Sequence, residues 1–174
     1  MEDLKIKKVC GFNISSIHFS MMILPYINKE LEQEKSVITI LEGNLEKNIK
    51  QVLSKITINN ESKEKILNIN WKDTDIRKFH IEKILKRELT EEKNNLDIIV
   101  YGSEKYINFV NDNIIKYIEK NNKIIKKKYI KIINCYTVND FNENIKEILD
   151  NHDIMFNTSG EHKIEEIFEG YHSA

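Results

Sequence analysis

Proline, glycine and cysteine are scarce in this sequence. Its 174 residues include one Pro, five Gly and two Cys. So few Pro and Gly leave little room for a flexible linker, and the length suits one domain, so we expect a single domain over residues 1–174. Cys10 and Cys135 form no C-x-x-C pair. This argues against a disulfide framework or a zinc ribbon and favours a reduced, cytoplasmic setting.

An excess of charge of one sign and long apolar runs are missing as well. Lys and Arg number 27 against 28 Asp and Glu, which gives a net charge of −1. A general nucleic-acid binder should carry a clear basic excess, so we expect no direct nucleic-acid partner. No stretch approaches the roughly 18 apolar residues of a membrane-spanning helix, and the N-terminus lacks the apolar segment of a signal peptide. We therefore also expect no membrane segment.

The sequence does contain a strand, a turn and a helix within residues 5–31. An apolar run that includes Gly11 leads to a polar turn at residues 13–16, where Ser15 or Ser16 is predicted to cap the helix that follows. The residues after the turn predict a helix with one apolar face, made of Ile17, Met21, Leu24, Ile27 and Leu31. Nucleotide-binding α/β domains hold a phosphate with this layout, but the G-x-x-x-x-G-K-[ST] sequence of a P-loop is absent.

Strands and helices alternate along the rest of the chain. The predicted strands are short β-branched runs: Ser36–Leu41, Ile66–Ile69, Asp97–Tyr101, Tyr129–Asn134 and His152–Asn157. Residues 59–65 are predicted to form a loop. Asp73 or Thr74 is predicted to cap the next helix, and Asn139 or Asp140 a later one. The alternation predicts an α/β fold, with a three-layer, mostly parallel sheet, helices on both faces and ligands at the C-terminal edge of the strands.

Four short segments give the chain a resemblance to a known family. They are KVCGFN at Lys8–Asn13, NINW at Asn68–Trp71, DIIVYGSE at Asp97–Glu104 and INCYTVNDF at Ile133–Phe141. In this order and spacing the chain resembles the MEDS family, the methanogen/methylotroph sensory domain, across nearly its whole length. The resemblance implies a RecA-like core without a P-loop that senses small molecules in prokaryotic signalling. Such domains are usually fused to a DNA-binding or histidine-kinase module.

The chain departs from the family pattern at four positions. Lys8 and Asn13 stand where the first motif of the family often has His and Tyr. The acid expected directly after the glycine of the third motif is displaced to Glu104. Asn134 aligns with the Cys that commonly lies two residues before the tyrosine, which is Tyr136 here. A ligand bound by the usual His and Cys would therefore meet different side chains in this protein.

Aromatic residues gather at the predicted C-terminal edge of the sheet. With two polar neighbours they form our candidate ligand-binding set: Phe12, Asn13, Trp71, Tyr101, Glu104 and Tyr136. An aromatic-lined pocket with few polar groups suits a small-molecule sensor. The same rings would equally serve to close the core beneath the loops. The sequence leaves both interpretations open.

Other candidate chemistry is weaker. The residues that would suit a metal are Cys10, Cys135, His18 and His152. Their spacing carries no metal-ligand signature, so we predict neither a metal site nor a cofactor. Asp97 begins its predicted strand, whereas the magnesium-holding acid of an NTPase should end it, and the P-loop lysine is missing. We therefore expect no catalytic residues.

Together these observations predict a non-catalytic sensory or regulatory domain. It would bind a small molecule or a signalling protein at the C-terminal edge of the sheet, with a homodimer left open. Two other functions remain open. One is an interaction module, a degenerate NTPase core that docks a kinase or a transcription regulator, and the other is a residual nucleotide-binding protein. A deep apolar pocket would favour the first function, a flat exposed apolar face the second, and an anion held at residues 13–16 the third.

Overall fold

One six-stranded sheet runs through the part of the chain that the structure describes. The computed structural model describes residues 4–91, 95–127, 129–137 and 145–167. The strands are β1 (Lys5–Asn13), β2 (Ser36–Leu41), β3 (Asn95–Gly102), β4 (Tyr129–Thr137), β5 (Ile154–Asn157) and β6 (Gly160–His162). They lie in the order β2-β3-β4-β1-β5-β6, and every neighbouring pair is parallel except β5 and β6. The predicted mostly parallel sheet is confirmed.

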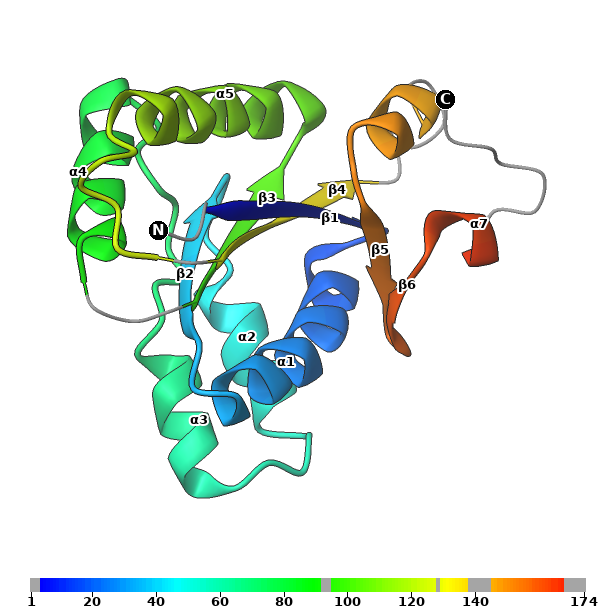
Figure 1. Cartoon of the computed structure of the whole chain (residues 1–174). Coiled ribbons are helices and arrows are strands. Elements are labelled where there is room, and N and C mark those ends of the chain that lie inside the picture. The colour runs from blue at the N-terminus through cyan, green and yellow to red at the C-terminus, as the bar shows by residue number, and fades with distance from the viewer. Residues whose placement is uncertain (1–3, 92–94, 128, 138–144, 168–174) are drawn as a thin grey trace.

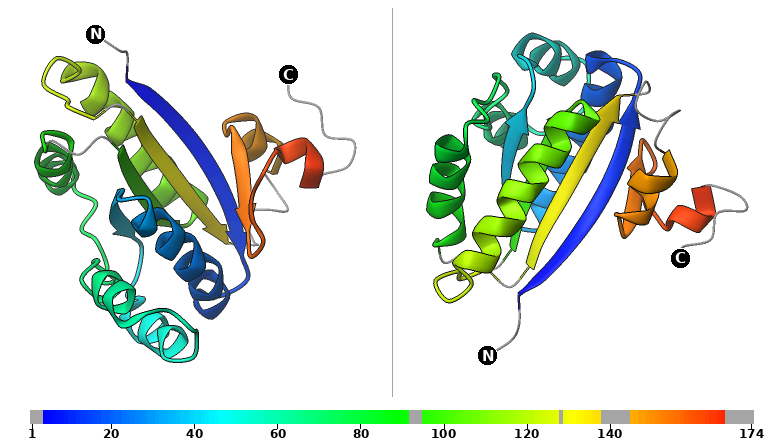
Figure 2. Two further views of the ribbon diagram at one scale, coloured as in Figure 1. Left: turned by 60° about the horizontal axis from the view of Figure 1, so that its bottom comes forward. Right: turned by 90° about the horizontal axis from the view of Figure 1, so that it is seen from above.

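Helices cover both faces of this sheet (Figure 1). On one, here called the α1 face, α1 (Ser16–Glu32) packs with α2 (Glu46–Leu53) and α3 (Asn60–Leu67). On the other, the α5 face, α4 (Lys78–Leu89) packs with α5 (Glu104–Lys120), and a further helix at residues 145–150 covers the part of the sheet near β5. The short helix α7 (Ile164–Ile167) follows β6. Figure 2 shows α5 lying along the sheet, with the 145–150 helix beyond β1. The chain has a three-layer α/β fold of the RecA-like type.

The two faces of the sheet carry separate apolar cores because side chains alternate along each strand. On β3, Ile98 and Val100 belong to the core of the α5 face, whereas Ile99 belongs to that of the α1 face. All three side chains are fully buried. Strands covered on both faces are continuously apolar, and this is why β3 could be recognised from the sequence.

Residues 59–69 differ from the predicted loop and strand. Asn59 caps α3 by accepting a hydrogen bond from the backbone N–H of Ser62 at 2.7 Å. The helix then runs to Leu67, and Ile66 is fully buried in the core of the α1 face. This helix has eight residues and only two apolar side chains, so its helical periodicity is too weak to recognise.

The long helix after α3 begins later than predicted. It starts at Lys78, and neither Asp73 nor Thr74 caps it. The Oγ1 atom of Thr74 instead accepts a hydrogen bond from the backbone N–H of Leu41 at 3.1 Å, and Oδ1 of Asp73 accepts one from Gly43 at 2.6 Å. The segment is therefore tied to the end of β2, because short polar side chains can satisfy a neighbouring strand as well as a helix end.

Helix α1 buries most of the predicted face but not Met21: Leu24 and Ile27 are fully buried, and Ile17 and Leu31 pack partly buried against the core. Ser15 does cap this helix, since its Oγ accepts the backbone N–H of His18 at 3.1 Å. Met21, however, is 54% exposed, whereas Phe19 and Ile23 are fully buried. The prediction that Met21 lies in the core is wrong. Helix α1 carries apolar residues around most of its circumference, and its buried face, which also includes Phe19, Met22 and Ile23, is broader than the predicted stripe.

The end of the described chain contains a strand that the sequence did not signal. The chain turns at residues 158–159, and β6 then pairs antiparallel with β5 before α7 begins. Three residues are too few for strand alternation to be visible in a sequence. The helix cap predicted at Asn139 or Asp140 lies outside the described residues.

Candidate functional site

The predicted aromatic residues lie on opposite faces of the sheet. Phe12 and Tyr136 pair in register on β1 and β4, and their ring centroids lie 5.8 Å apart on the α5 face. Tyr101 pairs in register with Cys135, one residue before Tyr136, and its side chain belongs to the α1 face. There its ring centroid lies 4.5 Å from that of Phe19. The structure therefore does not bring Tyr101 beside the other two rings.

Trp71 lies apart from the other predicted residues. It is 3% exposed in the core of the α1 face, and its Nε1–H donates to the carbonyl oxygen of Ile66 at 2.9 Å. Its own carbonyl oxygen accepts the backbone N–H of Leu45 at 2.8 Å. These contacts fasten the segment after α3 to the start of α2. Fluorescence of Trp71 would therefore report on this core rather than on the C-terminal edge of the sheet.

Asn13 ends β1 and joins it to β4. Its side chain is 1% exposed, and its Nδ2 donates to the carbonyl oxygen of Tyr136 at 3.0 Å. Its Oδ1 accepts no hydrogen bond within the described structure. A buried amide oxygen without a donor is unfavourable, so this atom can accept a hydrogen bond from a ligand at the C-terminal edge.

Glu104 and Tyr136 meet in a hollow on the α5 face, here called the polar hollow. It has a volume of about 180 Å³ and lies between α5 and the 145–150 helix, over β1 and β4. Its polar lining includes Lys8, Glu104, Asp112, Tyr136, Glu147 and His152. Two of the six predicted ligand-binding residues thus share one site with side chains from distant parts of the chain.

Three buried polar side chains form a hydrogen-bond network at the polar hollow, here called the floor: Asn111 and His152 line the hollow, and Asn134 lies behind them. Asn111 on α5 and Asn134 on β4 exchange two amide hydrogen bonds, of 2.8 and 3.0 Å. The Nδ2 of Asn134 also lies 2.9 Å from Nε2 of His152, and the Nδ2 of Asn111 donates to the carbonyl oxygen of Ile107 at 2.9 Å. Both amides therefore use both of their N–H donors, and each amide oxygen accepts a hydrogen bond. A fully satisfied network of this kind holds α5, β4 and the segment before β5 in fixed positions.

The imidazole of His152 is neutral in this network. Its Nδ1 lies against the carbonyl oxygen of Ile148, so we assign the proton to Nδ1, which leaves Nε2 to accept from Asn134. Burial lowers the pKa of His152 to about 4, and the hydrogen bond to Ile148 opposes this shift only in part. The ring also packs edge-on against Tyr136, with centroids 5.8 Å apart. A fixed neutral ring shapes the hollow and carries no charge at neutral pH.

The walls of the polar hollow carry more negative than positive charge. Lys8 projects from β1, where burial lowers its pKa while the charges of Asp112 and Asp153 act in the opposite direction. Glu104, Asp112 and Glu147 add three carboxyl groups to the lining. This excess of acidic groups favours a ligand with a positive charge. The described residues contain no group of three or more His, Cys, Asp or Glu side chains arranged to hold a metal ion.

Sequence reasoning did not single out the two asparagines of the floor. Asn111 lies in the apolar stripe of α5, between Ile107 and Ile114, and a polar residue in such a stripe was a usable signal. Asn134 ends an apolar run on β4, and its alignment with a family cysteine drew attention to it only indirectly. His152 was considered only as a metal ligand.

No protein-family model and no curated protein matches this chain. Within the described residues, no helix has the length and apolar character that crossing a membrane requires. The function is therefore inferred from the fold and from the polar hollow.

Proposed function

We propose that the chain is a non-catalytic sensory domain of the MEDS type that binds a small, positively charged or zwitterionic molecule in the polar hollow. The observation that carries the proposal is the convergence of Lys8, Glu104 and Tyr136, from three different elements, on one hollow. Lys8 and Glu104 line it, and Asn134 is hydrogen-bonded to two residues that line it, Asn111 and His152. The chain departs from the MEDS pattern at all three positions, two in the lining and one directly behind it, as a change of ligand at this site would require.

The size and charge of the polar hollow support a small polar ligand. Ligand pockets for drug-sized molecules span roughly 300–1,000 Å³. The polar hollow is smaller, at about 180 Å³, which suits a molecule the size of a simple amine or an amino acid. Its acidic walls would pair with the ammonium group, and Lys8 would pair with a carboxylate if the ligand carries one.

Two features support a non-catalytic role. The turn before α1 lacks the glycines and the lysine of a P-loop, so a triphosphate has no cradle there. Asp97 is the third residue of β3, at the opposite end of the strand from the C-terminal edge. It cannot hold a magnesium ion beside that turn, and we expect no hydrolysis of ATP or GTP.

The proposal is tested by finding which small molecules accompany the folded protein. Native protein is purified, its low-molecular-weight content is identified by mass spectrometry, and the affinity for an enriched cation is then measured by calorimetry. We expect Asp112→Asn to weaken binding about tenfold, because a charge-assisted contact contributes roughly 1.5–3 kcal/mol.

The matched control is Glu61→Gln, which removes a carboxylate from the exposed side of α3, far from the hollow in sequence and on the other face of the sheet. It should bind like the unmodified protein. Enrichment of no small cation, or equal losses in both variants, would overturn the proposal.

A further inference from the structure

A second cluster of charged side chains lies on the α1 face, near the N-terminal ends of the strands. Asp97 on β3, Lys131 on β4 and Lys7 on β1 pair in register and form one row across the sheet. A second row, two residues earlier on each strand, is formed by Asn95, Tyr129 and Lys5. Residues two apart on a strand share a face, so both rows project from the same side of the sheet.

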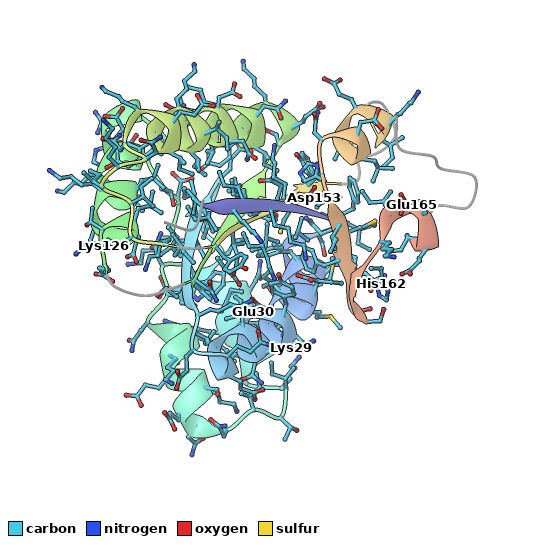
Figure 3. The ribbon with its side chains drawn as sticks, in the orientation of Figure 1. Lys29, Glu30, Lys126, Asp153, His162 and Glu165 are labelled. Carbon is cyan, nitrogen blue, oxygen red and sulfur yellow. The ribbon has the colours of Figure 1, made fainter. Side chains whose placement is uncertain are left out.

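The last turns of α1 cover the first row. Oε2 of Glu30, which is 5% exposed, lies 2.6 Å from Nζ of Lys35 and 3.4 Å from Nζ of Lys131. The Lys131 ammonium group also donates to Glu161 on β6 at 2.8 Å and to the hydroxyl oxygen of Tyr26 at 2.9 Å. Figure 3 shows Glu30 on α1, below the sheet. Lys131 is thus fully engaged, and in the second row the Tyr129 side chain is half exposed.

Asp97 and Glu30 form a carboxyl pair beneath this helix. Asp97 is 2% exposed and shares a hydrogen bond with Glu30. Burial, together with this bond and the charge of Glu30, raises the pKa of Asp97 to about 8. Burial acts in the same direction on Glu30, but the bond from Asp97 and the charges of Lys35 and Lys131 lower its pKa to about 2. At neutral pH the pair therefore holds one proton, which Asp97 donates to Glu30.

One oxygen of Asp97 remains without a donor. A carboxyl group that donates its single proton to Glu30 has a second oxygen that can only accept. The buried Oδ2 of Asp97 receives no hydrogen bond from an N–H or O–H group in the described part of the chain. An acceptor buried in this way favours any molecule that brings a donor to it.

A cavity of about 600 Å³ opens beside Asp97 at this end of the sheet. Its lining is mostly apolar and includes Ile6, Leu96, Ile130 and Tyr129; Leu96 and Ile130 belong to the core of the α5 face, so the cavity lies across the end of the sheet. The Tyr129 side chain is 50% exposed, so its ring is available to a flat partner. The volume lies within the range of about 300–1,000 Å³ that small-molecule sites occupy.

The charged residues around this cavity are mostly basic. Four lysines line it, namely Lys5, Lys7, Lys35 and Lys131, against Asp97 and Asp153. Among the described residues, Lys7 makes one long ion-pair contact, of 3.8 Å with Glu161, and Lys5 lies over the ring of Tyr129 at 5.7 Å. Both ammonium groups can turn toward an anion at little cost, because no short ion pair within this part of the chain holds either of them.

We propose that this cavity is a second binding site, for a small aromatic carboxylate that also carries a hydroxyl group. The carboxylate pairs with Lys5 and Lys7, the ring lies against Tyr129, and the hydroxyl group donates to Asp97. The site is separate from the polar hollow, because none of its lining residues lines the hollow, and it does not depend on the function proposed there.

The test uses 4-hydroxybenzoate, benzoate and inorganic phosphate as probes, with binding followed by calorimetry and by NMR titration. We expect 4-hydroxybenzoate to bind saturably at concentrations up to about 10 mM, and benzoate to bind at least about fivefold more weakly, because it cannot satisfy Asp97. Phosphate has no ring and should bind more weakly than either. No saturable binding of 4-hydroxybenzoate, or equal affinities for the two benzoates, would overturn the proposal.

Variants separate this site from a general attraction to lysines. Lys7→Gln should weaken the binding of both benzoates about fivefold or more, whereas Lys29→Gln, on the outer part of α1 (Figure 3), should leave it unchanged. Asp97→Ala should remove the preference for the hydroxyl group. Asp97→Asn should keep it, because an amide, like a protonated carboxyl, can donate to Glu30 and still accept. Equal losses in the two lysine variants would contradict the assignment even if Asp97→Ala fails to fold.

Discussion

Among single residues, Gly11 shows how a tertiary contact can set a residue type. It lies inside β1, where the backbone has the conformation of an ordinary strand and does not itself require glycine. A Cβ atom at this position would overlap the aromatic ring of Phe156 on β5. The ring therefore packs directly on the β1 backbone, and glycine is required for space rather than for backbone freedom.

The substitution Gly11→Ala should lower the free energy of unfolding by about 1–3 kcal/mol, the usual cost of overpacking a core. Urea unfolding measures this change. In a background of Phe156→Leu, where the side chain is smaller, the same substitution should cost clearly less. A cost below about 0.5 kcal/mol in the unmodified protein would show that the ring can move aside.

His152 should make stability depend on pH. Its folded-state pKa is about 4, against an ordinary value of about 6.5. Between these values the unfolded chain binds more protons, so the free energy of unfolding should fall as the pH drops. From pH 7 to pH 5 the contribution of His152 should be a loss of about 2 kcal/mol.

The comparison for this prediction is His152→Gln, measured by urea unfolding at both pH values. Asp97 acts in the opposite direction. Its pKa is raised to about 8, so the free energy of unfolding falls as the pH rises from the ordinary pKa of an aspartate toward that value. Because that effect is present in both proteins, it cancels in the difference between them. Equal pH dependence of the two proteins would show that His152 is not buried as a neutral ring.

Among the elements, α1 spans the α1 face from one end of the strands to the other: its first turn follows the C-terminal end of β1, and its last turns cover the charged row. Its buried face includes Phe19, Ile23 and Ile27, and Met21 points away from the sheet. What this helix contributes to the free energy of unfolding therefore depends on which of its apolar side chains pack on the sheet, and not on how many it carries.

Two neighbouring positions on α1 test this orientation. Ile23→Ala should lower the free energy of unfolding by about 2–5 kcal/mol, because it opens a cavity in a closed core. Met21→Ala should change it by no more than about 0.5 kcal/mol, since the side chain is mostly exposed. Urea unfolding of both variants is the measurement. A larger loss for Met21→Ala than for Ile23→Ala would mean that the helix is rotated about its axis.

For the whole molecule, the strand order separates a protected centre from weaker edges. β1, β3 and β4 each pair with a strand on both sides, whereas β2 and β6 end the sheet. β6 has three residues and pairs only with β5 among the described strands. Local opening is easiest where few buried apolar contacts and few strand pairings must be broken.

Hydrogen exchange should follow this order. Amides in the middle of β1, β3 and β4 should exchange only through global unfolding, and amides of β6 should exchange several orders of magnitude faster. Exchange measured by NMR at neutral pH, with and without low urea, distinguishes the two classes. Slow exchange in β6 that matches the central strands would indicate that its outer edge is covered in solution.

The sequence by itself determined the elements whose signals are local. The β-branched runs of β2, β3 and β4 and the cap at Ser15 were recognisable because strand propensity, apolar runs and capping depend on a few consecutive residues. Their alternation with helices was enough to predict the α/β class and the parallel sheet.

The tertiary structure alone decided what depends on contacts between distant residues. It turned residues 60–67 into a helix, rotated Met21 out of the core, and placed Tyr101 and Tyr136 on opposite faces through strand register. It also assembled the polar hollow and buried Asp97 beside Glu30. Register, burial and the pKa of a carboxyl group depend on which partners the fold supplies from elsewhere in the chain, and no local pattern of residues specifies those partners.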